Sequence, residues 1–212
     1  HGIMFWADEV ITGFGRTGSD FGCTTMGIEA PDMMTFAKQL SSAYMPISAS
    51  AIRRDMYEAM IDQSAAAGAF GHGYTYSSHP VACAVALKVL DIYQRDNIFE
   101  KVAITGEYLQ QRLAEFGDHP LVGEVRGSGL IGALELVANK ETGQAFANGA
   151  VGAYAQKAVQ DRGVILRTVA GSSLAFCPPL IITAGQIDEI IDATSHALDQ
   201  TLEYCRKEQL LV

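Results

Sequence analysis

Lys38 is the residue whose type and position first indicate chemistry. It follows the apolar run Met33–Ala37, and Asp8 stands thirty positions earlier, directly after the apolar run Ile3–Ala7. A lysine in apolar surroundings has a lowered pKa, so its neutral amine is available to attack an aldehyde. A carboxylate that follows a buried strand is costly unless a cation meets it. The pair is typical of a cofactor enzyme that needs a fixed anion and an amine nucleophile.

The residues after Asp8 extend this hypothesis. If the strand geometry persists, Asp8 and Val10 point to the same side because side chains alternate along a strand, and Glu9 points away. Asp8 would then meet a protonated pyridine nitrogen of a cofactor while Val10 covers a face of the ring. Two simpler interpretations stay open, an Asp8 that caps the following loop and a Lys38 that extends into solvent.

Two further residues have the right chemistry for binding anions. Thr75 precedes a helix expected from Val81, and its hydroxyl and backbone N–H could hold a phosphate near the start of that helix. Arg167 ends the apolar run Val164–Leu166 and could bind a substrate carboxylate through two parallel hydrogen bonds. An ordinary turn threonine and a strand-end salt bridge are the alternatives.

Composition excludes several classes of protein. The chain has 212 residues, 49% of them hydrophobic and 18% charged, which is enough apolar content for a real core. Its formal net charge of -9 argues against nucleic acid or an anionic membrane as a partner. No apolar stretch approaches the roughly 20 residues that span a bilayer. The four cysteines lack ligand-like spacing, so we expect reduced thiols in a cytoplasmic protein and no metal site.

The hydrophobic pattern predicts the elements that position these residues. The run at Ile3–Ala7 is typical of a buried strand in a parallel sheet, and a Gly-rich loop follows it. Further strands are predicted at Met33–Ala37, Ala49–Ile52, Leu130–Val137, Val164–Arg167 and Ser173–Cys177, and helices at Asp55–Ile61, from Val81 onward, at Ile98–Phe116, at Ala150–Asp161 and after Thr183. Thr183 and Gln186 match a capping box. We therefore expect the end of an α/β domain over residues 1–116 and a small α+β domain over residues 117–212.

Five ordered blocks of the chain resemble class III (omega) aminotransferases. The blocks are Asp8-Glu9-Val10 through Gly18, Pro31-Asp32 with Ala37-Lys38, Tyr74 through Ala84, Arg126 through Ile131, and Cys177 through Ile181. Five blocks at plausible spacing are far more specific than any one motif. The resemblance covers essentially the whole chain and implies the C-terminal half of a fold-type I enzyme that depends on pyridoxal 5'-phosphate.

The resemblance also implies a role for each candidate residue. It makes Lys38 the Schiff-base lysine and proton carrier, pairs Asp8 with the pyridine nitrogen and packs Val10 on the ring. It assigns the cofactor phosphate to Thr75 across a subunit boundary, which implies a homodimer with shared active sites. Arg167 resembles the arginine that holds the carboxylate of the amino acceptor.

Within the family, the sequence most resembles the omega-amino acid or amine:pyruvate branch. The expected reaction is ping-pong transfer of an amino group from an amine donor to pyruvate or a similar 2-oxo acid. An aminomutase of the same fold and a truncated dimerisation fragment without turnover are the alternatives. Three positions depart from the family, since Gln39, Ala43 and Ser48 stand where glycines are usual. These changes alter loop freedom without removing a reactive group.

Overall fold

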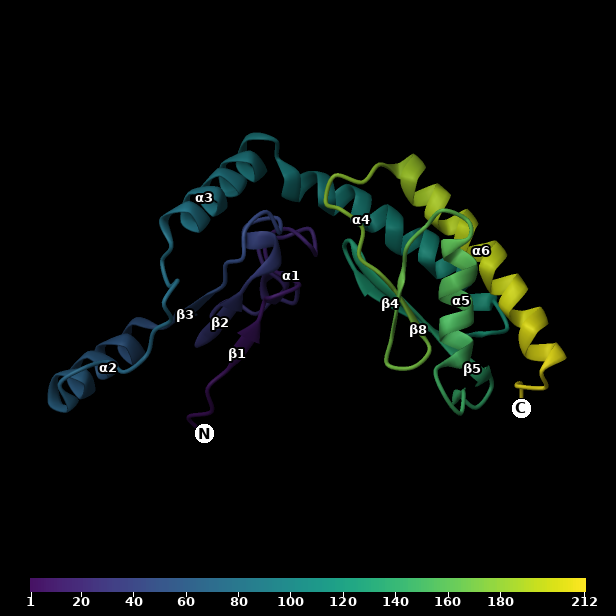
Figure 1. Cartoon of the computed structure of the whole chain (residues 1–212), viewed down its shortest axis with the longest axis horizontal. Coiled ribbons are helices and arrows are strands. Elements are labelled where there is room, and N and C mark those ends of the chain that lie inside the picture. The colour runs from purple at the N-terminus through teal and green to yellow at the C-terminus, as the bar shows by residue number, and fades with distance from the viewer. The chain divides into compact units, whose positions relative to one another are not determined.

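The computed structural model describes residues 1–212 and separates into two compact units, His1–Glu100 and Lys101–Val212 (Figure 1). Each unit is described by itself. The division falls inside helix α4 (Ile98–Ala114), whereas the sequence predicts a boundary between residues 116 and 117, inside the 3₁₀ turn η2 (Glu115–Asp118) that follows this helix. That predicted domain boundary stays a prediction.

The first unit is built on a three-stranded sheet in the order β1-β2-β3. Strands β1 (Trp6–Asp8) and β2 (Met33–Phe36) run parallel, with Asp8 opposite Thr35, and β3 (Ala49–Ile52) pairs antiparallel with β2. Because β1 and β2 are parallel neighbours, both C-terminal ends lie at the same edge of the sheet. Asp8 and the turn that begins at Lys38 therefore meet at this edge.

The first unit also contains α-helices and one 3₁₀ turn. They are α1 (Gly22–Thr25), the 3₁₀ turn η1 (Lys38–Leu40), α2 (Arg54–Ala67) and α3 (Pro80–Arg95). Helix α2 buries none of its residues, whereas α3 buries Ala82, Ala86, Val89 and Tyr93. The helix expected from Val81 onward is present and begins one residue earlier, and Val81 itself is 53% exposed.

The prediction that Ile3–Ala7 forms a buried strand of a parallel sheet is confirmed for the parallel pairing of β1 with β2 and wrong for its extent and burial. Strand β1 is only three residues long, and Trp6 within it is 59% exposed. Parallel strands are normally covered by helices on both faces. In this unit the apolar residues at and before the strand stay at the surface, with Ile3, Met4 and Phe5 being 85%, 59% and 45% exposed.

The second unit is an antiparallel sheet packed against helices. Its elements are η2 (Glu115–Asp118), β4 (Val122–Ser128), β5 (Ile131–Asn139), β6 (Gln144–Ala145), α5 (Ala150–Gln160), β7 (Arg167–Val169), β8 (Ser173–Phe176) and α6 (Ala184–Lys207). The strand order is β4-β5-β8-β7, with β6 pairing with β5. Strand β4 was missed by the sequence analysis because its glycines obscure the alternation.

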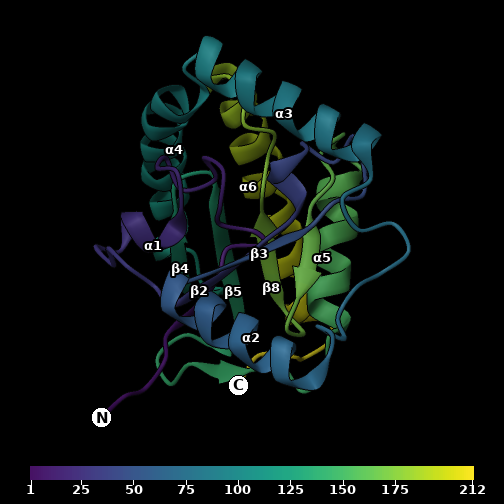
Figure 2. The same ribbon diagram turned by 90° about the vertical axis from the view of Figure 1, so that its left-hand side faces the viewer.

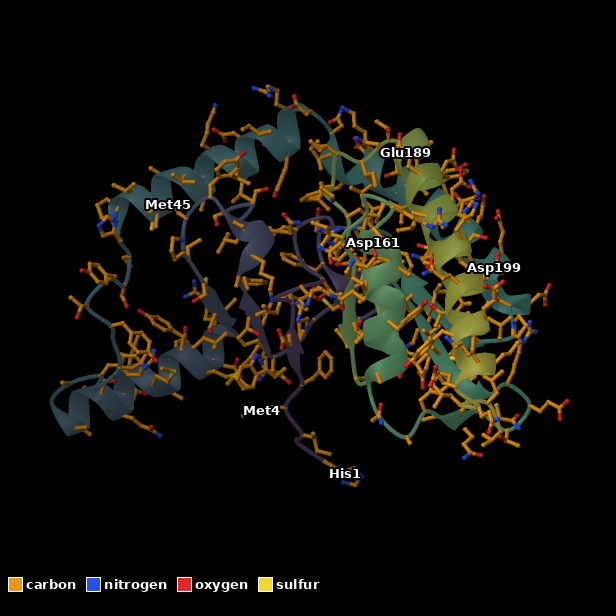
Figure 3. All side chains as sticks on the ribbon, turned by 45° about the vertical axis from the view of Figure 1, so that its right-hand side comes forward. His1, Met4, Met45, Asp161, Glu189 and Asp199 are labelled. Carbon is orange, nitrogen blue, oxygen red and sulfur yellow. The ribbon has the colours of Figure 1, made fainter.

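Helices α5 and α6 lie side by side and form the core of this unit with the sheet (Figure 2). Residues Leu134, Leu174, Ile187 and Leu198 are fully buried there. Figure 3 shows Glu189 and Asp199, both exposed, on the outer side of α6. The predicted capping box is confirmed, since the Thr183 hydroxyl accepts a hydrogen bond from Gln186 N and the Gln186 side chain accepts one from Thr183 N.

Candidate active site

Asp8 lies at the end of β1 with its side chain exposed. Its Oδ1 accepts hydrogen bonds from Val10 N at 3.1 Å and from Thr35 Oγ1 at 3.4 Å. The first contact caps the following loop, as the simpler interpretation of Asp8 expects. No hydrogen bond from the chain reaches Oδ2, so this oxygen keeps its capacity to accept one from a cation. Val10 is half-buried in the turn that follows.

Glu9 has the opposite environment, with only 2% of its surface exposed. Its carboxylate accepts hydrogen bonds from Gly22 N at 2.8 Å, Cys23 N at 2.7 Å and Thr12 Oγ1 at 2.5 Å. Burial acts to raise the pKa of Glu9, but these hydrogen bonds outweigh it and the net shift is downward. Glu9 thereby fixes the loop between β1 and α1.

Gly22 permits the close approach that this arrangement requires. A Cβ at this position would lie 2.7 Å from the Thr12 Cβ and 3.2 Å from Glu9 Oε2, which is too close for a real side chain. The sequence analysis predicted only that Glu9 points away from Asp8, and missed its function as a hydrogen-bond acceptor for α1. The spacing of Glu9 and Thr12 is the only local signal, and it is weak.

Lys38 begins the turn η1 in a left-handed backbone conformation, with φ of 45°. Its side chain is exposed and forms no salt bridge. The apolar surroundings expected for this lysine are therefore not supplied by the rest of the chain. Lys38 lies three residues after Thr35, the partner of Asp8 in the sheet, which brings the amine-bearing and carboxylate-bearing residues to one edge.

The turn after Lys38 contains two more left-handed residues that are not glycine, Ser42 with φ of 49° and Ala43 with φ of 61°. Such conformations cost roughly 1–2 kcal/mol per residue for side chains with a Cβ. Ser41 is 1% exposed, and its hydroxyl donates a hydrogen bond of 2.7 Å to the carbonyl of Met45, which Figure 3 labels. Side-chain hydrogen bonds of this kind hold the turn in its strained conformation.

Thr75 lies in an exposed turn just before α3. Within this turn Ser77 Oγ accepts a hydrogen bond from Tyr74 N at 3.1 Å, and the hydroxyl of Thr75 is not used. Helix α3 begins with Pro80, and its N-cap residue His79 makes no side-chain capping hydrogen bond. The first turn of the helix thus presents backbone N–H groups that no side chain of the chain satisfies.

Arg167 belongs to the second unit, where it is the first residue of β7 and pairs with Ala175 of β8. Its side chain is exposed and has no salt-bridge partner, so the strand-end salt bridge considered as an alternative is absent. Arg126, by contrast, contacts Glu124 at 2.8 Å and Glu135 at 2.5 Å.

No group of three or more histidine, cysteine, aspartate or glutamate side chains is arranged to hold a metal ion. The four cysteines are unpaired. None of the helices has the length and apolar character needed to cross a membrane.

Comparison with known proteins gives consistent results. The family model for class-III aminotransferases matches residues 1–198. The chain is 48% identical over 200 residues to the putrescine–pyruvate aminotransferase of Pseudomonas aeruginosa, covering 94% of this chain and 42% of that protein. It is 43% identical over 200 residues to the chloroplastic gamma aminobutyrate transaminase 3 of Solanum lycopersicum, covering 94% and 38% of the two chains.

Solved structures agree with this relationship. The omega transaminase from Pseudomonas jessenii in complex with PMP superimposes with a TM-score of 0.90 at 47% identity, covering 95% of this chain and 44% of that one. A transaminase with L-alanine gives a TM-score of 0.91 at 46% identity, covering 95% and 47%. The chain thus spans less than half the length of these relatives, and the predicted partial α/β fold of this enzyme class is confirmed.

Proposed function

The chain belongs to the class-III aminotransferase family, and from that premise we propose that its full-length protein transfers an amino group from an amine or omega-amino acid to pyruvate or a similar 2-oxo acid. The observation that carries this proposal is the meeting of Asp8 and Lys38 at the C-terminal edge of β1 and β2. The relatives compared are named as aminotransferases and transaminases, which favours transfer over the aminomutase alternative.

The family points to pyridoxal 5'-phosphate as the cofactor, and three features of the chain fit it. Oxygen Oδ2 of Asp8 is without a hydrogen bond, Lys38 is without a counter-ion, and the start of α3 has no side-chain cap. Asp8 suits the ring nitrogen of the cofactor, Lys38 suits its aldehyde, and the start of α3 suits its phosphate. When bound, pyridoxal phosphate supplies an aldehyde that amines can join and a protonated ring that withdraws electrons.

The residues of the chain would act on this group in different ways. Asp8 would hold the ring nitrogen protonated through a charge-assisted hydrogen bond, because its carboxylate favours the cationic form. Val10 would pack against one face of the ring and exclude water. The amine of Lys38 would hold the aldehyde carbon before substrate binds, and afterwards carry a proton to and from the substrate carbon.

Two residues would complete binding. Thr75, exposed in the turn before α3, would bind the phosphate in a partner subunit, and this sharing requires a homodimer. Arg167 would bind the carboxylate of the 2-oxo acid through two parallel hydrogen bonds, and its lack of an internal salt bridge leaves it available. The substrates are thus a small amine donor and a small 2-oxo acid.

Steady-state transamination by the full-length protein tests the proposal. With pyruvate and a series of diamines and omega-amino acids, we expect alanine to form with ping-pong kinetics. The Lys38→Ala variant should lose at least about 10²- to 10⁴-fold in kcat, the range typical of a positioned proton carrier. Lys88→Ala, which alters an exposed lysine on α3, should retain activity. Wild-type protein that binds cofactor without turnover would favour the dimerisation fragment instead.

A further inference from the structure

The backbone of Lys38 depends on contacts from outside its own turn. Turn η1 is held locally by backbone hydrogen bonds, from Leu40 N to Ala37 O at 3.0 Å, from Ser41 N and Ala43 N to Lys38 O, each at 3.2 Å, and from Ser42 N to Gln39 O at 3.2 Å. These bonds close the turn but do not choose which way the amine points. With Lys38 and Ala43 both in left-handed conformations, an external contact is needed to make this geometry the only stable one.

Tyr93 of α3 supplies such a contact. Its ring is 8% exposed and packs against Phe99 with 5.6 Å between ring centroids. Its hydroxyl lies 3.0 Å from the carbonyl oxygen of Gln39 and 3.1 Å from Gln39 Oε1. A hydroxyl carries a single proton, which here lies between two acceptor oxygens, the backbone carbonyl and the side-chain oxygen of the residue next to Lys38.

The carbonyl that accepts from Tyr93 also joins the two sides of the turn, because Ser42 N donates a 3.2 Å hydrogen bond to Gln39 O. Burial raises the pKa of Tyr93, and the Ser42 side chain acts against that effect. The Tyr93 contact therefore falls on the group that connects Gln39 with Ser42. Gln39 stands where the family usually has glycine, so the contact through its side chain is a feature of this chain.

We propose that Tyr93 is a positioning residue for Lys38, acting through Gln39 and Ser42 to hold the lysine in the backbone conformation that directs its amine to the cofactor. The inference rests on the proposed function, since it assumes that Lys38 bonds the cofactor and carries the proton. Because a buried ring on a long helix moves little, the hydroxyl fixes the turn to α3. Without it, Lys38 would sample other backbone conformations and its amine would lie correctly only part of the time.

The test compares Tyr93→Phe with the wild type in the full-length holoenzyme. Phenylalanine keeps the packed ring and removes only the hydroxyl. We expect kcat to fall about 10-fold while the KM values of both substrates change less than about twofold, because the loss acts in the chemical step. The pH at which the visible absorbance of the lysine-bound cofactor changes should also shift, a signature that a loss of stability alone would not produce.

Two further variants keep the result interpretable. Gln39→Met removes the side-chain acceptor but keeps the backbone carbonyl, so its loss of kcat should be smaller than that of Tyr93→Phe. Tyr108→Phe deletes a hydroxyl that donates a 2.6 Å hydrogen bond to Asp188 in the other unit, and serves as the control for losing a tyrosine hydroxyl. It should lower the melting temperature without changing the absorbance titration.

Different results would refute different claims. If Tyr93→Phe and Gln39→Met both titrate and turn over like the wild type, Tyr93 has no positioning role, whatever their melting temperatures. If wild-type Lys38 forms no covalent bond to the cofactor, the proposed function itself is wrong. Loss of turnover in Tyr93→Phe with an unchanged absorbance titration would also contradict the proposal, because the defect would then lie away from Lys38.

Discussion

Asp8 and Glu9 are consecutive carboxylates with opposite surroundings, and each environment suits a different task. Successive side chains of an extended chain point in opposite directions. Glu9 is therefore buried beneath the loop while Asp8 is exposed at the sheet edge. Glu9 satisfies two backbone N–H groups at the start of α1. We infer that the buried carboxylate fixes the loop so that the exposed one keeps its direction.

Removing the charge of Glu9 tests this structural role. Glu9→Gln should lower the free energy of unfolding by about 1–3 kcal/mol, because the amide group cannot accept from both backbone donors and leaves one unsatisfied. Denaturant unfolding of the full-length protein measures the change. Glu29→Gln, at an exposed position, is the matched control and should be nearly neutral. Equal stabilities for the two variants would show that the Glu9 contacts contribute nothing.

The same residue predicts a dependence of stability on pH. The pKa of Glu9 is lower in the folded protein than its ordinary value of 4.5, so the folded state binds the proton less well than the unfolded state. Its stabilising contribution is complete above pH 4.5 and is lost as the pH falls through the lower folded value. Unfolding measured from neutral pH downward should therefore show a steeper decline in wild type than in Glu9→Gln.

Arg167 gives a prediction about substrate affinity. If it binds the 2-oxo acid, Arg167→Ala loses a charge-assisted pair worth about 1.5–3 kcal/mol, and the KM for pyruvate should rise about 10- to 100-fold. The half-reaction with a diamine donor, which carries no carboxylate, should keep its rate. Stopped-flow measurement of each half-reaction separates the two. Arg162→Ala, at an exposed site after α5, is the control. A slower diamine half-reaction would contradict this role.

At the scale of elements, the turn after Lys38 explains why glycines are usual there. Ala43 has φ of 61°, a conformation that glycine adopts without steric cost. The sequence alone identified Ala43 as a departure from the family but did not show its backbone angle. The left-handed angle of Ala43 is a property of the folded turn and is known only from the structure.

Ala43→Gly should relieve that strain. We expect the free energy of unfolding to rise by about 0.5–1 kcal/mol, because the relief exceeds the extra entropy that glycine gives the unfolded chain. Ala43 is exposed, so no packing is lost. Ala59→Gly on α2 makes the same chemical change in an exposed helix and should destabilise the protein by a similar amount. Destabilisation by both substitutions would show that the turn is not strained.

Elements with a complete hydrophobic pattern were predicted well. Helix α4 buries Leu109 and Leu113, and Phe116 is buried in the turn η2 that follows it. The start of α6 was marked by its capping box. Strand β7 begins at Arg167, later than the apolar run Val164–Leu166 suggests. That run follows the end of α5 and precedes the pairing of β7 with β8, and within it Leu166 is buried whereas Ile165 is 83% exposed.

At the scale of the molecule, the two units differ in how far the chain can bury its own apolar residues. The second unit has a dense core, whereas in the first unit Trp6, Tyr74 and Tyr76 are 59%, 78% and 80% exposed. The chain spans less than half the length of its relatives, and exposed apolar surface of this extent marks sites of interaction. The sequence blocks predict the site residues, and those assignments stay predictions, whereas the exposure of Lys38 and Thr75 could not be predicted because it depends on how the folded chain packs.

Borohydride reduction of the full-length protein after treatment with pyridoxal phosphate, followed by peptide mass mapping, tests the central claim most directly. Reduction makes a lysine–cofactor bond permanent, so the mapped peptide identifies the residue that holds the cofactor. We expect a pyridoxyl adduct on Lys38 alone, lost in Lys38→Ala. Label spread over exposed lysines such as Lys88, or no adduct at all, would contradict the assignment of Lys38 and the site built around it.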